Sequence, residues 1–161
     1  REYALLLGHT TPVDLRDKEQ IDVHQVAAPL RMAASQIIAD AAHITQGELN
    51  ELALASDLWR AAYSLWPENV EALEARIELS RELGEHAKLA DDLEELADLL
   101  LDIHARFDAL TESARLWYVE MGEPERARQL YAEAIAMVED DPSPPEGLDA
   151  ARRALRALQS E

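Results

Sequence analysis

Histidine and carboxylate side chains are the groups in this sequence that could bind a metal ion or transfer protons. The five histidines are His9, His24, His43, His86 and His104. No two of them stand four residues apart, so there is no H-E-x-x-H zinc pair, and the chain has no cysteine. Asp102, His104 and Asp108 are close in sequence, but offsets of two and six residues do not face one way on a helix. We therefore expect surface histidines and no metal site.

Carboxylates also occur as adjacent pairs, at Asp91-Asp92, Glu94-Glu95 and Asp140-Asp141. Neighbouring residues diverge on a helix, so this spacing does not bring two carboxyl groups together for general acid–base catalysis. The sequence has no phosphate-binding glycine-rich loop and no G-x-S-x-G motif, and its acidic segment EDDPSPPEG lacks the calcium-loop pattern. We expect no enzyme activity and no cofactor.

Composition indicates a helical protein with an acidic surface. The 161 residues are enough for about one domain, 48% of them are hydrophobic, and only 5 are glycine. The formal net charge is −18, from 33 acidic and 15 basic residues. Such a charge disfavours nucleic acid and anionic membranes and favours a basic protein or peptide as the partner. A role of the charge in solubility alone is the alternative.

The start of the chain and its apolar runs bear on its location in the cell. The longest aliphatic run is LLL at 99–101, which predicts no membrane insertion. The chain begins with Arg1, and no signal-like segment follows. We expect a fragment of a longer protein, cytoplasmic in location. The excess of arginine over lysine is typical of a bacterial genome rich in GC.

Small and large residues alternate on one helical face in the segment ALASDLWRAAYSLWPEN. Ala55, Trp59 and Ala62 are four and three residues apart, so they form one stripe in which the ring fills the space beside two small residues. Pro67 is expected to end this helix. The same spacing recurs at Leu89, Leu93 and Leu96 and at Ala127, Tyr131 and Ala134. A self-similar period of about 34 residues is typical of stacked helical hairpins.

With these residues the sequence resembles the tetratricopeptide repeat (TPR) family over roughly residues 28–160. The family pattern of alanine, aromatic residue, alanine and proline is matched in full by Ala55, Trp59, Ala62 and Pro67. The second match comprises Ala127, Tyr131 and Ala134, with Pro142 a few residues late, and Ala114 and Trp117 look like first-helix positions. The resemblance implies an all-α, right-handed α-solenoid of about three helix-turn-helix repeats. A related two-helix repeat family is the alternative.

The period predicts seven helices and one domain. The expected helices are 24–45, 48–66, 69–83, 86–103, 106–121, 124–139 and 145–160. Gly84 and Gly122 suit the left-handed position after a helix end, and Pro124 suits a first helical turn. The last helix is expected to be a terminal cap that begins with Ser143 as N-cap, Pro144 as the first residue and Glu146 in a capping box. Residues 1–23 are expected to be irregular, and residues 24–160 to form the repeat domain.

The resemblance also implies a peptide-binding groove lined by the first helix of each repeat. Counting from the repeat starts places in it Glu71, Glu74, Glu78, Arg81, Asp108, Thr111, Arg115 and Tyr118, with Gln36, Asp40 and His43 from the first repeat. One subset of the family binds a terminal carboxylate through lysines and asparagines. The two lysines here, Lys18 and Lys88, fall outside the groove, so we expect no carboxylate clamp.

Two further features bear on partners. Residues 85–112 hold nine acids against Lys88 and Arg106, which predicts either a docking face for a basic partner or a solvated face. Trp66 and Tyr118 lie beside the core stripe and are either buried or partner-facing. The sequence therefore predicts a non-catalytic protein-interaction or scaffold module. The alternatives are a structural segment of a larger assembly or self-associating chain, and a regulatory domain of a larger enzyme.

Overall fold

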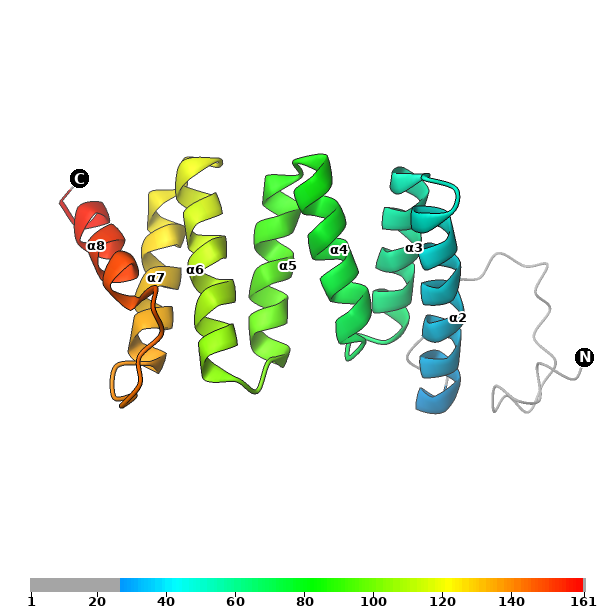
Figure 1. Ribbon diagram of the computed structural model, residues 1–161, viewed down its shortest axis with the longest axis horizontal. Coiled ribbons are helices and arrows are strands. Elements are labelled where there is room, and N and C mark those ends of the chain that lie inside the picture. The colour runs from blue at the N-terminus through cyan, green and yellow to red at the C-terminus, as the bar shows by residue number, and fades with distance from the viewer. Residues whose placement is uncertain (1–26, 161) are drawn as a thin grey trace, which may run out of the picture. The chain divides into compact units, whose positions relative to one another are not determined.

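Helix-forming residues dominate the chain, and the computed structural model is built of helices joined by short loops (Figure 1). The structure describes residues 27–160, and within that range it has no β-strand. The helices are α2 (Ala28–Gly47), α3 (Leu52–Leu65), α4 (Val70–Leu83), α5 (His86–Leu99), α6 (Ile103–Val119), α7 (Pro124–Met137) and α8 (Leu148–Leu158). The all-α prediction is confirmed, whereas the predicted irregular segment 1–23 lies outside the described residues.

The helices are divided between two compact units whose boundary lies inside α4, between Ala72 and Leu73. The first unit contains α2, α3 and the first turn of α4, and α2 packs against α3. The second unit contains the rest of α4 and the helices α5 to α8. In this second unit α5 packs on α6, α6 on α7 and α7 on α8.

Trp59 is the centre of the first unit. Its side chain is 0% exposed, and Ala55 and Ala62 on the same stripe of α3 are also fully buried. The indole Nε1 donates a hydrogen bond to Gln46 Oε1 at 3.1 Å, and the ring meets the His43 ring edge-on at 4.7 Å between centroids. The predicted small–large–small stripe is confirmed, and α3 ends at Leu65, just before Pro67.

A buried serine ties the two helices of the first unit to the start of α4. Ser35 Oγ on α2 donates to the carbonyl oxygen of Ala62 on α3 at 2.8 Å and accepts a hydrogen bond from Asn69 Nδ2 at 2.9 Å. Asn69 Oδ1 in turn accepts from the backbone N–H of Ala72 at 3.1 Å. The first N–H groups of a helix have no acceptor within the helix. Asn69 therefore supplies the acceptor for one of these N–H groups at the start of α4.

Two helix starts differ from the prediction for identifiable reasons, and a third agrees with it. α3 begins at Leu52 instead of residue 48 because Asn50 adopts a positive φ of 53°, which interrupts helical geometry. α6 begins at Ile103 instead of residue 106, because the carboxylate of Asp102 accepts hydrogen bonds from the N–H groups of His104 and Ala105. Pro124 begins α7 as predicted.

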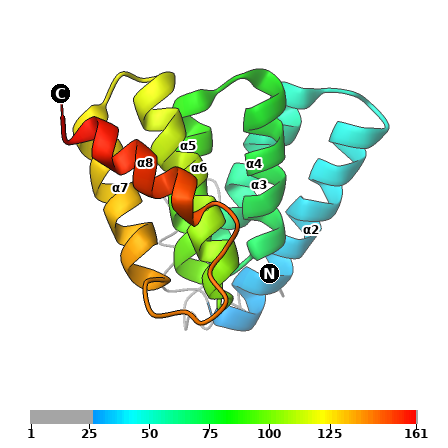
Figure 2. The ribbon, with the colours of Figure 1, turned by 60° about the vertical axis from the view of Figure 1, so that its left-hand side comes forward.

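The predicted start of the last helix is wrong. α8 begins at Leu148 with Gly147 as its N-cap and no side-chain cap, so Ser143, Pro144 and Glu146 do not have the predicted roles. The N–H of Ser143 instead bonds to Asp141 Oδ1 at 2.8 Å. Gly147 then lies against the ring of Phe107 on α6, where an added Cβ would come within 3.1 Å of Phe107 Cε1. The chain therefore contacts α6 before it turns into α8, which packs on α7 (Figure 2).

Gly84 provides a direct test of the predicted left-handed turn. Gly84 and Gly122 have φ values of 68° and 67°, as their position after a helix end predicts. A side chain at Gly84 would meet no atom within 4 Å, so Gly84→Ala should cost only the backbone strain. We expect this variant to lower the free energy of unfolding by about 1 kcal/mol, measured by urea titration with far-ultraviolet circular dichroism.

The matched control for this prediction is Gly47→Ala. Gly47 is the last residue of α2, and a side chain there would also meet no atom within 4 Å, but its φ is negative. Alanine should raise the free energy of unfolding at this site by up to about 1 kcal/mol, because it is the better helix former. Equal effects of the two substitutions would show that φ at Gly84 does not limit stability.

Candidate functional site

The predicted site residues on α4 lie on its solvent-facing side. Glu74, Glu78 and Arg81 follow one another at four and three residues, and all three are exposed. The opposite side of the helix buries Leu73, Ile77 and Ser80, which fixes this orientation. Among the described residues, no basic side chain contacts Glu74 or Glu78.

Glu71 lies in the first turn of the same helix but belongs to the first unit. Its Oε1 lies 3.0 Å from Nε2 of His43 on α2, and both side chains are more than half exposed. His43 was predicted to line the first repeat. His43 of α2 and Glu71 of α4, both predicted to line the groove, therefore contact each other within the first unit. Gln36 and Asp40 of α2 bond to each other at 3.2 Å instead.

The predicted residues on α6 have mixed environments. Asp108 and Arg115 are exposed, Tyr118 is 38% exposed, and the same helix buries Phe107 and Ala114 on its other side. Thr111 is half-buried, and its hydroxyl donates to the carbonyl oxygen of Phe107 at 2.9 Å. Thr111 is therefore engaged with its own helix and is a weak candidate for ligand binding.

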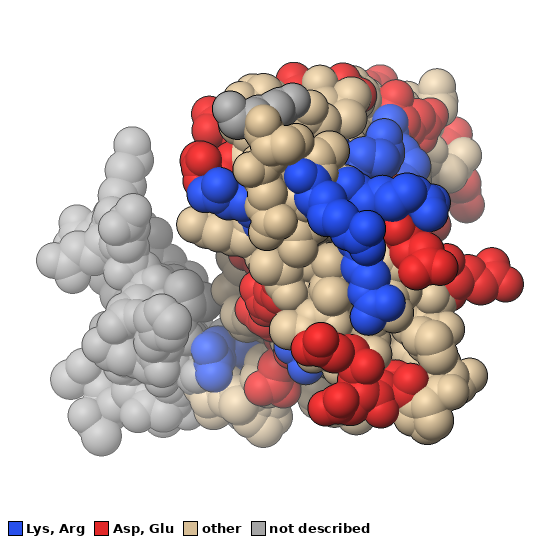
Figure 3. Space-filling model, turned by 90° about the vertical axis from the view of Figure 1, so that its left-hand side faces the viewer, with Lys and Arg blue, Asp and Glu red and all other residues tan. Residues whose placement is uncertain are grey.

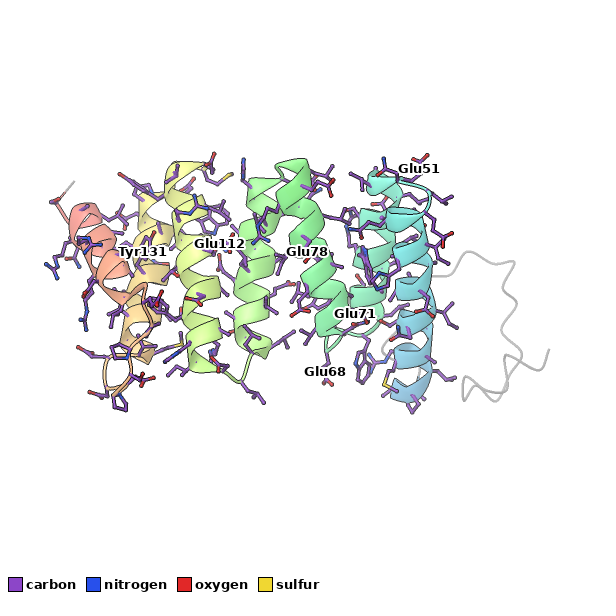
Figure 4. All side chains as sticks on the ribbon, in the orientation of Figure 1. Glu51, Glu68, Glu71, Glu78, Glu112 and Tyr131 are labelled. Atoms are coloured by element: carbon purple, nitrogen blue, oxygen red, sulfur yellow. The ribbon has the colours of Figure 1, made fainter. Side chains whose placement is uncertain are left out.

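One ion pair joins the two predicted faces within the second unit. Arg81 Nη2 on α4 lies 2.9 Å from Glu112 Oε1 on α6. Figure 4 labels Glu112 on α6 and Glu78 on α4. Arg81 was predicted to line the groove from the sequence, whereas Glu112, which neighbours Thr111 in sequence, was not. The pair shows that side chains of α4 and α6 meet at Arg81 and Glu112. We call this surface the α4/α6 face, and its members are Glu74, Glu78, Arg81, Asp108, Glu112 and Arg115.

The acidic stretch 85–112 is largely neutralised within the second unit. Asp91 and Glu94 on α5 lie 3.3 and 3.2 Å from Nη2 of Arg126 on α7. Glu85 pairs with Lys88 at 2.7 Å, Glu112 pairs with Arg81, and Asp102 caps α6. This finding does not favour α5 as a docking face for a basic partner.

Asp92 is the most perturbed acid of that stretch. It is 2% exposed, and its Oδ1 lies 2.5 Å from Nη2 of Arg76 on α4. Burial raises the pKa of Asp92 to about 6, against the lowering effect of the Arg76 charge. A buried pair of this kind positions α5 against α4 and lies away from the exposed carboxylates of the α4/α6 face. We assign it a structural role.

A second polar cluster centres on Glu94 and joins three helices. Glu94 Oε1 accepts hydrogen bonds from Ser113 Oγ at 3.0 Å and from Trp117 Nε1 at 2.8 Å, both on α6. Arg126 of α7 contacts the same carboxylate at 3.2 Å, and its guanidinium carbon lies 4.2 Å from the Trp117 ring centroid. Trp117 was predicted as core and is instead half-buried, with its polar edge satisfied by Glu94.

The remaining sequence candidates also have local partners. His104 Nε2 lies 2.8 Å from Asp141 Oδ2. The pKa of Asp141 is lowered, first by the hydrogen bond from the Ser143 N–H and second by the hydrogen bond with His104. His86 lies 3.8 Å from Glu120. Trp66 is half-buried with the Arg31 guanidinium 5.8 Å from its ring. Within residues 27–160 no three histidine or acidic side chains converge as metal ligands would. His9, His24 and Lys18 lie outside the described residues.

Positive charge gathers where α8 lies (Figure 3). Arg152, Arg153 and Arg156 fall within one third of the helix circumference, while Leu148, Ala151 and Leu158 are buried on the other side. Arg152 lies 4.0 Å from Asp149, whereas Arg153 and Arg156 have no acidic partner among the described residues. In the sequence this basic face corresponds to the run RRALR at 152–156, and it was not predicted as a site.

Comparison with known proteins adds no family to these observations. No protein-family model matches the sequence, and no curated protein sequence matches it. In the part of the chain that the structure describes, every helix is too short or too polar to cross a bilayer.

Proposed function

We propose that this chain is a non-catalytic protein-interaction module of TPR-like hairpins in a right-handed solenoid, which binds a basic peptide or protein segment. The α4/α6 face would be the binding surface. The observation that carries the proposal is the ion pair between Arg81 and Glu112, because it aligns α4 with α6 and leaves the exposed carboxylates of Glu74, Glu78 and Asp108 around it.

Charge distribution supports this choice of surface. Four of the five acids of α5 lie within 4.0 Å of Arg76 or Arg126. In contrast, Glu74, Glu78 and Asp108 form no ion pair with a basic side chain in the described part of the chain. Exposed carboxylates on two adjacent helices attract lysine and arginine and speed encounter with a cationic segment. Arg115 lies on the same surface and would repel a basic side chain of the peptide placed beside it. This repulsion would limit the positions in which a basic peptide can bind along the surface.

Selection of peptides tests this proposal. A phage-displayed library of random peptides panned against the chain should enrich lysine- and arginine-rich sequences. The triple variant Glu74→Gln/Glu78→Gln/Asp108→Asn should weaken binding of a selected peptide about tenfold in fluorescence anisotropy, since exposed charge pairs contribute up to about 1 kcal/mol each. Binding should also weaken as salt rises.

The matched control is Asp98→Asn/Glu133→Gln/Glu139→Gln. It removes three exposed acids that likewise contact no basic side chain among the described residues, but it leaves the α4/α6 face intact. This control should change affinity by no more than about twofold. Equal losses in both triple variants would show that total charge, and not this face, attracts the peptide. Enrichment of peptides without basic residues would also overturn the proposal.

A further inference from the structure

Helix α8 is basic within an acidic protein. Its 11 residues hold three arginines and one acid, whereas the whole chain has 33 acidic and 15 basic residues. Leu148, Ala151 and Leu158 are buried on one side of α8, which packs on α7. Arg153 and Arg156 are exposed on the other side. We call this surface the α8 basic face, and its members are Arg152, Arg153 and Arg156.

The guanidinium groups of the α8 basic face are available to a ligand. Arg153 and Arg156 are one turn apart and contact no acidic side chain within residues 27–160. Arg152 lies 4.0 Å from Asp149, which is too far for a hydrogen bond. In contrast, every arginine of α4 and α7 lies within 4.0 Å of a carboxylate. The arginines of α4 and α7 are therefore used within the fold, whereas those of α8 are not.

Two ordinary roles of surface arginine do not account for this face. A helix is stabilised by a basic residue in its last turn, which explains Arg156 but not Arg152 or Arg153. In a chain of net charge −18, each arginine reduces the net charge that keeps the protein soluble. A binding role accounts for all three arginines, because guanidinium groups recognise carboxylates through paired hydrogen bonds.

The size of the face and the charges around it favour a short acidic ligand. The 11 residues of α8 span about 16 Å. Glu139 and Asp140, in the segment that precedes α8, are exposed, and red carboxylates border the blue patch in Figure 3. A nucleic acid or an anionic bilayer extends beyond α8 and would meet such acids, whereas a short peptide need not. Physiological salt screens charges over about 8 Å, so acids on more distant helices repel a ligand at α8 only weakly.

We propose that the α8 basic face binds a short acidic peptide segment of a partner protein. Arg152 and Arg153 precede Arg156 by four and three residues, so neighbouring carboxylates of one segment can contact two guanidinium groups at once. This inference does not rest on the proposed binding of a basic peptide, because it uses another surface of opposite charge. If both surfaces bind their ligands, the chain joins a basic partner to an acidic one.

A titration of the whole chain with a hexaglutamate peptide, followed by nuclear magnetic resonance, tests the proposal. The amide signals of α8 and the Nε–H signals of its arginines should shift, whereas the amide signals of α3 should not. Arg153→Gln/Arg156→Gln should weaken binding about tenfold, since two charge pairs are lost. The control Arg60→Gln/Lys88→Gln changes the net charge equally at two exposed cations that already pair with acids near them in sequence. It should change affinity by no more than about twofold.

Asp149 provides a test of opposite sign. Its side chain is 84% exposed one turn before Arg152, so its carboxylate competes with an acidic ligand for that guanidinium. Asp149→Asn should therefore tighten the binding of hexaglutamate about threefold. The control Asp98→Asn makes the same change in net charge on α5 and should leave the affinity unchanged.

Three results would overturn the α8 site, and none of them bears on the α4/α6 face. Hexaglutamate that shifts no signal of α8 would show that these arginines do not bind carboxylates. Equal weakening by the two double variants would assign the attraction to total charge. Binding of oligothymidine or of phosphatidylserine vesicles at α8, with no response to hexaglutamate, would assign the face to nucleic acid or to membrane instead.

Discussion

Trp59→Ala should lower the free energy of unfolding by about 3–5 kcal/mol, the largest loss expected from any single substitution in the first unit. The side chain is fully buried between alanines, and these small neighbours cannot expand to fill the space that it would leave. The substitution would also remove the hydrogen bond from Nε1 to Gln46. Because native domains are stable by only about 5–15 kcal/mol, much of the first unit's stability should be lost.

Urea titration followed by circular dichroism at helical wavelengths measures this loss without relying on the tryptophan that is removed. Leu54→Ala is the control on the same helix, because Leu54 is exposed, and it should change stability by no more than about 0.5 kcal/mol. Trp59→Phe should recover most of the packing but not the hydrogen bond to Gln46. A loss below about 1 kcal/mol for Trp59→Ala would mean that the stripe on α3 does not organise the core.

The second large effect is on the pH dependence of stability, through Asp92. Burial raises the pKa of Asp92 from 3.8 to about 6 in the folded protein. Between these two values the folded state binds the proton more tightly than the unfolded state does, so stability falls as pH rises from about 4 to about 6. The full difference is up to about 3 kcal/mol, of which about 1 kcal/mol should be regained between about pH 7.5 and pH 5.

Asp92→Asn separates this effect from the general repulsion among the acids of the chain. Urea titrations of both proteins across that pH range should show the wild-type chain gaining stability over the variant as pH falls. Asp98→Asn is the control, since Asp98 lies exposed on the same helix, and its profile should run parallel to that of the wild type. A constant difference between wild type and Asp92→Asn would show that the Arg76 charge fully offsets burial.

Local periodicity was enough to predict the all-α class and the approximate positions of the helices. The spacing of Ala55, Trp59 and Ala62 identified a buried helix face, and Gly84 and Pro124 marked where helices end and begin. These features depend on residues a few positions apart, which one sequence shows directly. The start of α8 was mispredicted because the contact of Gly147 with Phe107, 40 positions earlier, outweighs the local capping pattern at Ser143.

The candidate site was harder to predict because its partners are far apart in sequence. Counting along α4 and α6 correctly indicated that Glu78, Arg81 and Asp108 are exposed. It could not indicate that Arg81 meets Glu112, or that most acids of α5 pair with arginines of α4 and α7. Such pairs depend on how helices pack, and one sequence without relatives gives no co-varying positions to reveal them.

Glu94 also bears on how the second unit opens. One carboxylate receives hydrogen bonds from Ser113 and Trp117 of α6 and from Arg126 of α7, while it belongs to α5. If α6 or α7 moved away alone, the half-buried carboxylate would lose donors that water replaces only in part. The network therefore penalises fraying of any one of these helices. We therefore expect α5, α6 and α7 to open together as one cooperative unit in hydrogen exchange.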